Sequence, residues 1–376
     1  MIYADHAATT ALSPGALEAM TPWLQDQYGN PSTLYRLARE PRKAVEHARE
    51  MVAAAIGAMP EEIFFTSGGT EADNWAIKGA VLRAADHKGG VVSSCIEHHA
   101  VLNPCAFLER LGYTVDYLPV NQEGVVDPLQ LNGFLSDSSS LVSVMLANNE
   151  IGSIQPVREL AEIAHEAGCL MHTDAVQAVG HVPIDVNQLG VDLLAASAHK
   201  FNGPKGVGFL YVRKGVELEP LMHGGAQEKH MRAGTENVAC IVGMAAALEE
   251  HVNNLEAEVT YLSSLGNVLV EALASSGLDY RLNGAKNRIP GSSSVSFKGV
   301  EGEMLLHRLD LMGTAVATGS ACDSVNTVLS HVVRAIKVPD EYAHGTIRIT
   351  LGMDNTPEQV KLIVDQIQKI IGKAER

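Results

Sequence analysis

The chain has 376 residues, of which 46% are apolar and 19% are charged, a balance that is typical of a globular protein and excludes a disordered or fibrous one. Its formal net charge is -16 and no Lys/Arg-rich block offsets it, so direct, extended binding to nucleic acid is disfavoured and a small substrate is favoured. The N-terminus has no signal-peptide pattern, and no apolar run approaches the roughly 18 residues of a membrane helix, so we expect a cytoplasmic protein without a membrane span.

The cysteines are widely spaced and form no CxxC motif, which indicates free thiols in a reducing compartment. They are Cys95, Cys105, Cys169, Cys240 and Cys322. Cys95 and Cys169 lie in apolar runs typical of strands, where a thiol packs as a small hydrophobic group. Cys322 lies among small and polar residues and is the exception.

Short apolar runs alternate with amphipathic stretches from residue 60 to about 215, a pattern that predicts α/β layering. The expected strands are 62–66, 91–95, 141–147, 170–174, 193–197 and 207–212. The expected helices are 70–85, 100–111 and 157–167, the last two ending at a glycine.

The pattern changes after residue 215 and predicts a smaller α+β domain. A long helical stretch over about 236–275 is followed by expected strands at 293–297 and 346–351. The last helix begins at Thr356, with Pro357 at its first position and Gln359 placed for a capping box. A chain of this length exceeds the roughly 250 to 300 residues that one core accommodates, so two domains are expected.

The segment 67–71, Ser-Gly-Gly-Thr-Glu, lies where a strand gives way to a helix. Its glycines permit a tight turn, and the free N–H groups at the start of the helix favour an anion there. The alternative is an ordinary strand-to-helix turn. The segment has neither the Gly-Lys-Ser/Thr of a Walker loop nor the GxGxxG pattern.

The segment Glu97-His98-His99 is expected to close the strand that contains Cys95. It could be taken for a metal cluster, but no CxxC or HExxH motif supports a zinc site. Adjacent histidines on a strand would also face opposite sides. We therefore expect no metal, and a His98 that stacks on a ring or moves a proton.

Two further segments follow strands, whose carboxyl ends face the ligand crevice of an open α/β sheet. Asp174 could hold the protonated nitrogen of a pyridine ring, or simply cap a helix. Lys200 precedes a Gly-Pro turn and could form a Schiff base with an aldehyde cofactor, although most lysines are surface residues. An anion site, a ring-nitrogen carboxylate and a Schiff-base lysine, in this order, are what pyridoxal phosphate requires.

The loop 319–324 presents Cys322 among small residues, which favours a nucleophile over a packed thiol. Together these segments make the chain resemble the NifS/IscS-type cysteine desulfurases of the class V aminotransferase family over nearly its whole length. The resemblance is carried by residues 5–10, 29–32, 65–74, 97–98, 148–152, 174–177, 199–200, 203–206, 231–235, 319–322 and 348.

The resemblance implies the α/β fold type I of pyridoxal-phosphate-dependent transferases. A large cofactor-binding domain over 15–255 would contain a mixed, mostly parallel sheet. A smaller α+β domain over 256–376 would carry the loop of the catalytic cysteine, and residues 1–14 would contribute to the small domain and to the active site.

The resemblance also implies roles for single residues. Lys200 would hold pyridoxal 5'-phosphate covalently and act as general base, Asp174 would pair with the ring nitrogen, and His98 would stack on the ring. Asn149 and Gln177 would approach the ring hydroxyl. The phosphate would contact Gly69, Thr70, Ser197 and His199, together with Thr235 of a neighbouring subunit, which implies a homodimer.

The implied substrate is L-cysteine, whose carboxylate would be bound by Arg348 and Asn30. Cys322 would take the sulfur as a persulfide for a sulfur-acceptor protein serving iron–sulfur cluster assembly, tRNA thiolation or DNA phosphorothioation. Asp323 stands where the family usually has Thr, and its carboxylate should disfavour the Cys322 thiolate. The chain also lacks the longer C-terminal tail of members that engage an iron–sulfur scaffold.

Two alternatives remain open at this stage. The first is another class V enzyme, an aminotransferase or a kynureninase-like hydrolase, in which Cys322 would be incidental. The second is a weakly active protein that scaffolds a sulfur-transfer complex.

Overall fold

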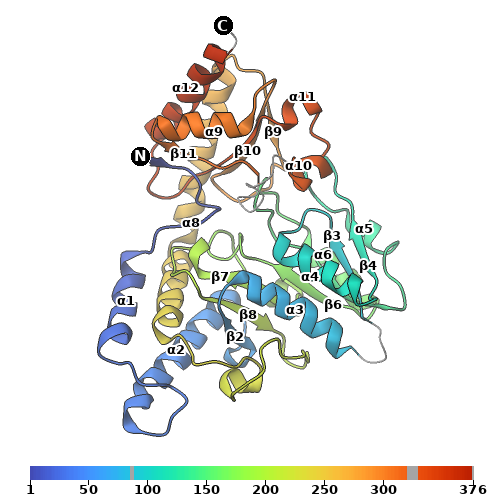
Figure 1. Cartoon of the computed structure of the whole chain (residues 1–376), viewed down its shortest axis with the longest axis vertical. Coiled ribbons are helices and arrows are strands. Elements are labelled where there is room, and N and C mark those ends of the chain that lie inside the picture. Colours follow the sequence, from blue (N-terminus) through green and yellow to red (C-terminus); the bar gives the residue numbers. More distant parts are fainter. Residues whose placement is uncertain (85–88, 320–328, 375–376) are drawn as a thin grey trace.

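The computed structural model describes residues 1–84, 89–319 and 329–374. Two bodies of different size lie one above the other, and one long helix, α8 (Val238–Ser275), runs through both (Figure 1). The larger body contains most of the chain up to this helix. The smaller one combines the N-terminal strand with the C-terminal third.

The large body is built on a seven-stranded sheet with the order β2-β8-β7-β6-β5-β3-β4. Neighbours from β7 to β4 are parallel, whereas β8 runs antiparallel to both β2 and β7. The strands are β2 (Ile63–Thr66), β3 (Gly90–Ser94), β4 (Val115–Leu118), β5 (Ser139–Ser143), β6 (Leu170–Asp174), β7 (Leu193–Ser197) and β8 (Gly208–Val212). The expected mixed, mostly parallel sheet is therefore present.

Helices cover both faces of this sheet, because successive strand residues point to opposite sides and apolar ones occur on both. Val91 belongs to an apolar core that includes residues of α3 and α4, whereas its neighbour Val92 belongs to another that includes residues of α2, α6 and α8. The helices of this body are α1 (Pro14–Gln25), α2 (Arg39–Ile56), α3 (Gly69–Arg83), α4 (His99–Arg110), α5 (Pro128–Leu131), α6 (Val157–Glu166) and α7 (Val186–Leu189).

The small body contains an antiparallel sheet with the order β12-β10-β9 and a short parallel pair, β1 with β11. Its strands are β1 (Ile2–Tyr3), β9 (Tyr280–Asn283), β10 (Ser292–Phe297), β11 (Thr314–Ala315) and β12 (Thr346–Thr350). Its helices are α9 (Gly302–Leu311), α10 (His331–Ala335), α11 (Asp340–Ala343) and α12 (Pro357–Ala374). Its core includes residues of α8, α9 and α12.

The proposed domain boundary after residue 255 lies inside α8. Leu248 belongs to the core of the large body, and Leu262, four helical turns later, belongs to the core of the small one. One helix thus contributes apolar residues to both cores.

In the large body, one expected strand is shorter in the structure and one helix was not expected. The strand expected over 141–147 ends at Ser143, although Val144 and Leu146 still donate to backbone carbonyls of His172 and Asp174. The chain stays beside β6 but leaves β3, which an apolar run alone does not reveal. Helix α2 was not among the expected elements, although Val45, Val52 and Ile56 lie on its buried face and Gly57 ends it in the left-handed conformation.

Within the described ranges, no helix combines the length and the apolar composition that crossing a membrane requires.

Candidate active site

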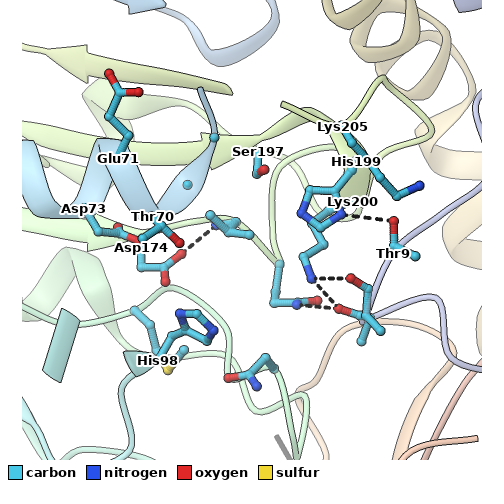
Figure 2. A pocket seen from close by; sticks show the side chains of 18 of the residues that line it. Thr9, Thr70, Glu71, Asp73, His98, Asp174, Ser197, His199, Lys200 and Lys205 are labelled. Carbon is cyan, nitrogen blue, oxygen red and sulfur yellow. Dashed lines mark hydrogen bonds between the residues drawn. The ribbon is translucent and has the colours of Figure 1, made fainter. Parts of the chain in front are cut away.

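A cavity of about 560 Å³ opens where β6 and β7 end, beside the first turn of α3 and the N-terminal segment. Ten of the residues expected at the site line it: Gly69, Thr70, His98, Asn149, Asp174, Gln177, Ser197, His199, Lys200 and Arg348. They are far apart in sequence and meet because β2, β6 and β7 end at the same edge of the sheet. Figure 2 shows the Asp174 carboxylate and the Lys200 amine on opposite sides of the cavity, with Ser197 and His98 on its other walls.

Lys200 ends a short 3-10 turn, Ala198–Lys200, that directly follows β7. Its Nζ donates to the backbone carbonyls of Ala7, at 2.6 Å, and Ala8, at 2.9 Å. The N-terminal segment is itself held here, since Thr10 Oγ1 donates to the carbonyl of His199 and Gln177 Nε2 donates to that of Ala7. The amine thus points into the cavity and not to bulk solvent.

Asp174 is the last residue of β6 and is 5% exposed. Its Oδ1 accepts a hydrogen bond from the backbone N–H of Val176, at 2.9 Å, which fixes the carboxyl group. The residues that follow form a turn and not a helix, so Asp174 is not a helix cap. Burial raises the pKa of Asp174 above its ordinary value, and the charges of His98 and Lys200 offset part of this rise. A positively charged ring nitrogen would stabilise the carboxylate further.

His98 caps α4, because its Nδ1 accepts from the backbone N–H of Ala100 at 3.1 Å. The expectation that Glu97, His98 and His99 close a strand is therefore wrong: β3 ends at Ser94 and α4 begins at His99. Burial lowers the pKa of His98, against the attraction of Asp174, so the ring is neutral and can stack on another ring. The described residues contain no group of three or more His, Cys, Asp or Glu side chains placed to hold a metal ion.

The first turn of α3 forms the anion-binding end of the cavity. Gly68 precedes the helix with φ +147° and ψ -178°, a conformation that only glycine adopts readily. A Cβ on Gly69 would lie 2.5 Å from Cγ2 of Val176, so the helix starts in close contact with the β6 turn. The first N–H groups of a helix have no partner within it. Gly69 and Thr70, at the start of α3, line the cavity together with Ser197 and His199.

An ion pair holds this turn from outside. Nε and Nη2 of Arg232 contact the two carboxylate oxygens of Glu71 at 2.8 and 3.0 Å, and Glu71 also accepts from the backbone N–H of Ser67. Burial alone would raise the pKa of Glu71, but the hydrogen bonds from Arg232 and Ser67 lower it below its ordinary value.

Arg348 reaches the cavity from β12 of the small body. Its Nη2 donates to Asp5 Oδ1 at 2.7 Å and its Nη1 donates to the carbonyl of Asn149 at 2.8 Å. These two contacts hold the guanidinium plane and leave one N–H on each Nη atom for a ligand. A carboxylate fits such a fork in two parallel hydrogen bonds.

Two of the expected residues that the structure describes, Asn30 and Thr235, do not line the cavity. The side chain of Asn30 accepts from the backbone N–H of Ser32 at 2.9 Å, in a turn before α2. Thr235 is exposed, in the segment before α8. Cys322 lies outside the described residues, as does Asp323.

The structure adds residues that the sequence analysis missed. Asp5 fixes Arg348, Lys205 lines the anion-binding end of the cavity, and Asp73 lines its wall behind Asp174. Asp73 had a signal in the sequence, because it lies four residues after Gly69 and so on the same helix face. The pairing of Asp5 with Arg348 spans 343 residues and left no local signal.

These groups fit an aldehyde cofactor that carries a phosphate. The glycines of the α3 turn, Ser197, His199 and Lys205 offer N–H, hydroxyl and cationic groups to an anion at one end. A lysine amine and a buried carboxyl lie further in, where an aldehyde and a ring nitrogen would lie. The neutral His98 ring closes one wall.

The aminotransferase class-V family model matches residues 2–363 of the chain. A cysteine desulfurase IscS of Dictyoglomus turgidum is 50% identical over 373 residues, which cover 99% of this chain and 95% of that protein. A solved NifS-like protein has a TM-score of 0.93 and 38% identity, with 99% of each chain covered. SspA in complex with cysteine has a TM-score of 0.84 and 34% identity, covering 94% of this chain and 99% of that one.

Proposed function

Because this chain belongs to the class-V aminotransferase family, we propose that it is a cysteine desulfurase that uses pyridoxal 5'-phosphate. The observation that carries the proposal is the convergence of Lys200, Asp174 and Arg348 on one cavity, in a chain half identical to a cysteine desulfurase over its whole length. The cofactor, when bound, supplies an aldehyde that captures amino groups and a ring that withdraws electrons from the substrate α-carbon.

The residues of the chain divide the remaining work. Arg348 binds the carboxylate of L-cysteine through the two N–H groups that Asp5 and Asn149 leave available. Lys200 holds the cofactor and, once the substrate has replaced it, removes the α-proton as a general base. Asp174 keeps a proton on the ring nitrogen, because its negative carboxylate stabilises the positive charge that the proton brings.

Cys322 accepts the sulfur in this proposal. Its thiolate attacks the sulfur of the bound substrate, so that a sulfur–sulfur bond forms while the carbon–sulfur bond breaks. The electron pair of the broken bond returns to the substrate carbon, which takes up a proton, and alanine leaves. The net change converts L-cysteine and one thiol into L-alanine and one persulfide.

Replacement of Cys322 by Ser tests this proposal, because a hydroxyl cannot form a persulfide. We expect the C322S holoenzyme to bind cysteine but to release neither alanine nor, with dithiothreitol present, sulfide. Cys240→Ser is the control, since Cys240 lies on α8 and does not line the cavity. Alanine release by C322S at the rate of C240S would reject the desulfurase function and favour another class V reaction.

We also propose that the protein works as a homodimer and passes its sulfur to a separate acceptor protein. Thr235 is exposed outside its own cavity, so it is available to the phosphate site of a second copy. The segment before α2 exposes Leu34 by 93%, Tyr28 by 74% and Tyr35 by 53%, which an interface would cover. Radiolabelled sulfur transfer from the persulfide to candidate acceptors for iron–sulfur assembly, tRNA thiolation and DNA phosphorothioation tests the second part.

Mixed dimers test the first part. A Lys200→Ala subunit paired with a Thr235→Asp subunit has one site with both changes and one site with neither. Random pairing makes half of the dimers mixed, so about a quarter of the activity should return on mixing two inactive variants. No recovery, with subunit exchange verified by mass, would place Thr235 in its own subunit's site, and a Thr235→Asp variant that is active by itself would remove Thr235 from the site.

A further inference from the structure

Asp73 is a buried carboxyl group that the proposed reaction does not use. It lies in the second turn of α3, is 1% exposed, and forms part of the cavity wall. Its Oδ1 makes no hydrogen bond within the part of the chain that the structure describes. The polar atom that lies near it is Nε2 of His172, at 3.5 Å.

His172 does not supply a positive charge to this carboxyl. It is fully buried in β6, and burial lowers the pKa of His172 to about 3, so the imidazole is neutral at physiological pH. Its Nδ1 shares a hydrogen bond of 2.8 Å with the hydroxyl of Ser143. A neutral imidazole can donate to Asp73 or accept from it, but it cannot balance a negative charge there.

The other ionisable groups around Asp73 are also acids. Figure 2 shows Asp73 beside Asp174 on the wall of the cavity, and Glu97 is fully buried nearby, where it accepts from Ser94 and from the backbone N–H of Met145. Burial, followed by repulsion from Asp174 and Glu97, raises the pKa of Asp73 well above its ordinary value. The positive charge of Lys200, by contrast, acts on Asp174, whose pKa it lowers.

We propose that Asp73 is a positioning residue that stays a neutral carboxylic acid and so confines the negative charge of the buried acids to Asp174. Ionised Asp73 would repel the Asp174 carboxylate and weaken its hold on a protonated ring nitrogen, because Coulomb repulsion between buried charges is only weakly screened. Neutral Asp73 with neutral His172 adds no charge to this wall. The inference deepens the proposed function and rests on its assignment of Asp174 to the ring nitrogen.

Asp73→Asn and Asp174→Asn form a matched pair of tests, since each replaces a carboxyl by a neutral amide of the same shape. We expect D73N to bind pyridoxal phosphate within about threefold of the wild-type affinity, because an amide mimics the neutral acid. We expect D174N to lose at least about tenfold, because it removes the charge itself. A loss of about tenfold or more in D73N, with an unchanged circular dichroism spectrum, would show that the carboxylate form is needed and overturn the proposal.

Infrared spectra of the cofactor-free protein labelled with ¹³C-aspartate give a second readout that does not involve activity. Wild-type protein at pH 7 should show the carbonyl band of a protonated, labelled carboxylic acid, and D73N should lose the part that Asp73 contributes. Because only aspartate carries the label, the buried acid of Glu97 does not contribute, and D174N identifies any part that comes from Asp174. A band that is equally strong in wild type and D73N, or is absent from the wild type, contradicts the proposal.

If D73N does not fold, His172→Gln tests whether Asp73 stays protonated without the imidazole. The glutamine keeps a neutral polar group near Asp73, so the labelled acid band should persist. Replacement of that band by a carboxylate band would mean that the imidazole controls the proton. Neither spectrum depends on cysteine or on Cys322, so failure of this inference is distinguishable from failure of the desulfurase function.

Discussion

The Lys200 amine is held in a fixed position in the cavity by two hydrogen bonds. A flexible lysine would lose rotamer entropy on being fixed, but here its amine donates to Ala7 and Ala8 and lies across the cavity from Asp174. We predict that Lys200→Ala abolishes the yellow colour of the purified protein, because the covalent link between this amine and the cofactor aldehyde absorbs visible light. Absorbance spectra and borohydride trapping followed by peptide mass spectrometry are the measurements.

Lys205→Ala is the matched control for this change, since Lys205 lines the same cavity at its anion-binding end. That variant should keep the visible absorbance and bind the cofactor more weakly. Borohydride labelling at Lys205, or at any lysine other than Lys200, would remove Lys200 from its assigned position.

Arg348 carries a second prediction at the residue scale. Arg348→Lys keeps the positive charge but loses the planar fork that Asp5 and the Asn149 carbonyl hold in place. We expect KM for cysteine to rise by about 10- to 100-fold, the equivalent of losing one charged hydrogen bond of about 1.5 to 3 kcal/mol. Steady-state kinetics measure it, with exposed Arg308→Lys on α9 as the control. An unchanged KM would mean that the substrate carboxylate binds elsewhere.

Helix α3 is the element on which the anion-binding end of the cavity depends. Gly68 has φ +147° and ψ -178°, and this conformation costs a residue with a side chain on the order of 1–3 kcal/mol. A Cβ there would also lie 3.5 Å from Ser197 Oγ, in the space between the helix and β7. We predict that Gly68→Ala weakens pyridoxal phosphate binding by about tenfold or more while the far-ultraviolet circular dichroism stays unchanged.

Gly277→Ala separates this effect from general backbone strain. Gly277 also has a left-handed φ of +71°, follows α8, and meets nothing within 4 Å of its would-be Cβ. It should lower thermal stability without changing cofactor affinity. Equal affinity in the two variants would show that the α3 turn does not bind the phosphate.

The bounds of a strand or helix could be predicted where they depend on the local sequence, but not where they depend on a neighbouring strand. The strands ending at Asp174 and Ser197 have the expected bounds, because each begins with apolar residues and ends at a polar one. The end of β5 depends on where β3 departs, whereas α2 carried an apolar face that the sequence analysis missed. The same holds for the site. Its residues at strand ends could be predicted from the sequence, whereas the contact between Asp5 and Arg348 could be found only from the fold.

At the scale of the whole molecule, both bodies supply residues to the cavity. The N-terminal strand pairs with β11 in the small body, and the next residues run to Lys200 in the large one. Arg348 from β12 faces the same cavity, and α8 contributes to both cores. Substrate binding and cofactor binding therefore depend on how the two bodies are held together, which no single segment of the sequence encodes.

The stability of the whole cofactor-free protein should depend on pH through two fully buried groups, Glu97 and His172, whose pKa values are shifted in opposite directions. Burial raises the pKa of Glu97 to about 8, so the folded state holds this proton where the unfolded chain, with a pKa of about 4.3, has lost it. Stability from this group is complete below pH about 4.3 and falls as pH rises toward 8. Burial lowers the pKa of His172 to about 3, so its contribution is complete above pH about 6.5 and falls as the solution becomes more acidic.

Between pH about 4.3 and 6.5 the slopes of these two groups oppose each other, and above pH 6.5 the slope of His172 disappears while that of Glu97 remains. Each proton changes the unfolding free energy by about 1.4 kcal/mol per pH unit, so Glu97 removes about 2 kcal/mol between pH 6.5 and 8. Glu97→Gln keeps an acceptor for Ser94 and Met145 and cannot ionise, so its loss of stability over this range should be smaller by that amount. Urea unfolding at pH 6.5, 7.2 and 8 measures the difference, with exposed Glu40→Gln as the control. Parallel slopes in wild type and E97Q would mean that Glu97 is already ionised in the folded protein.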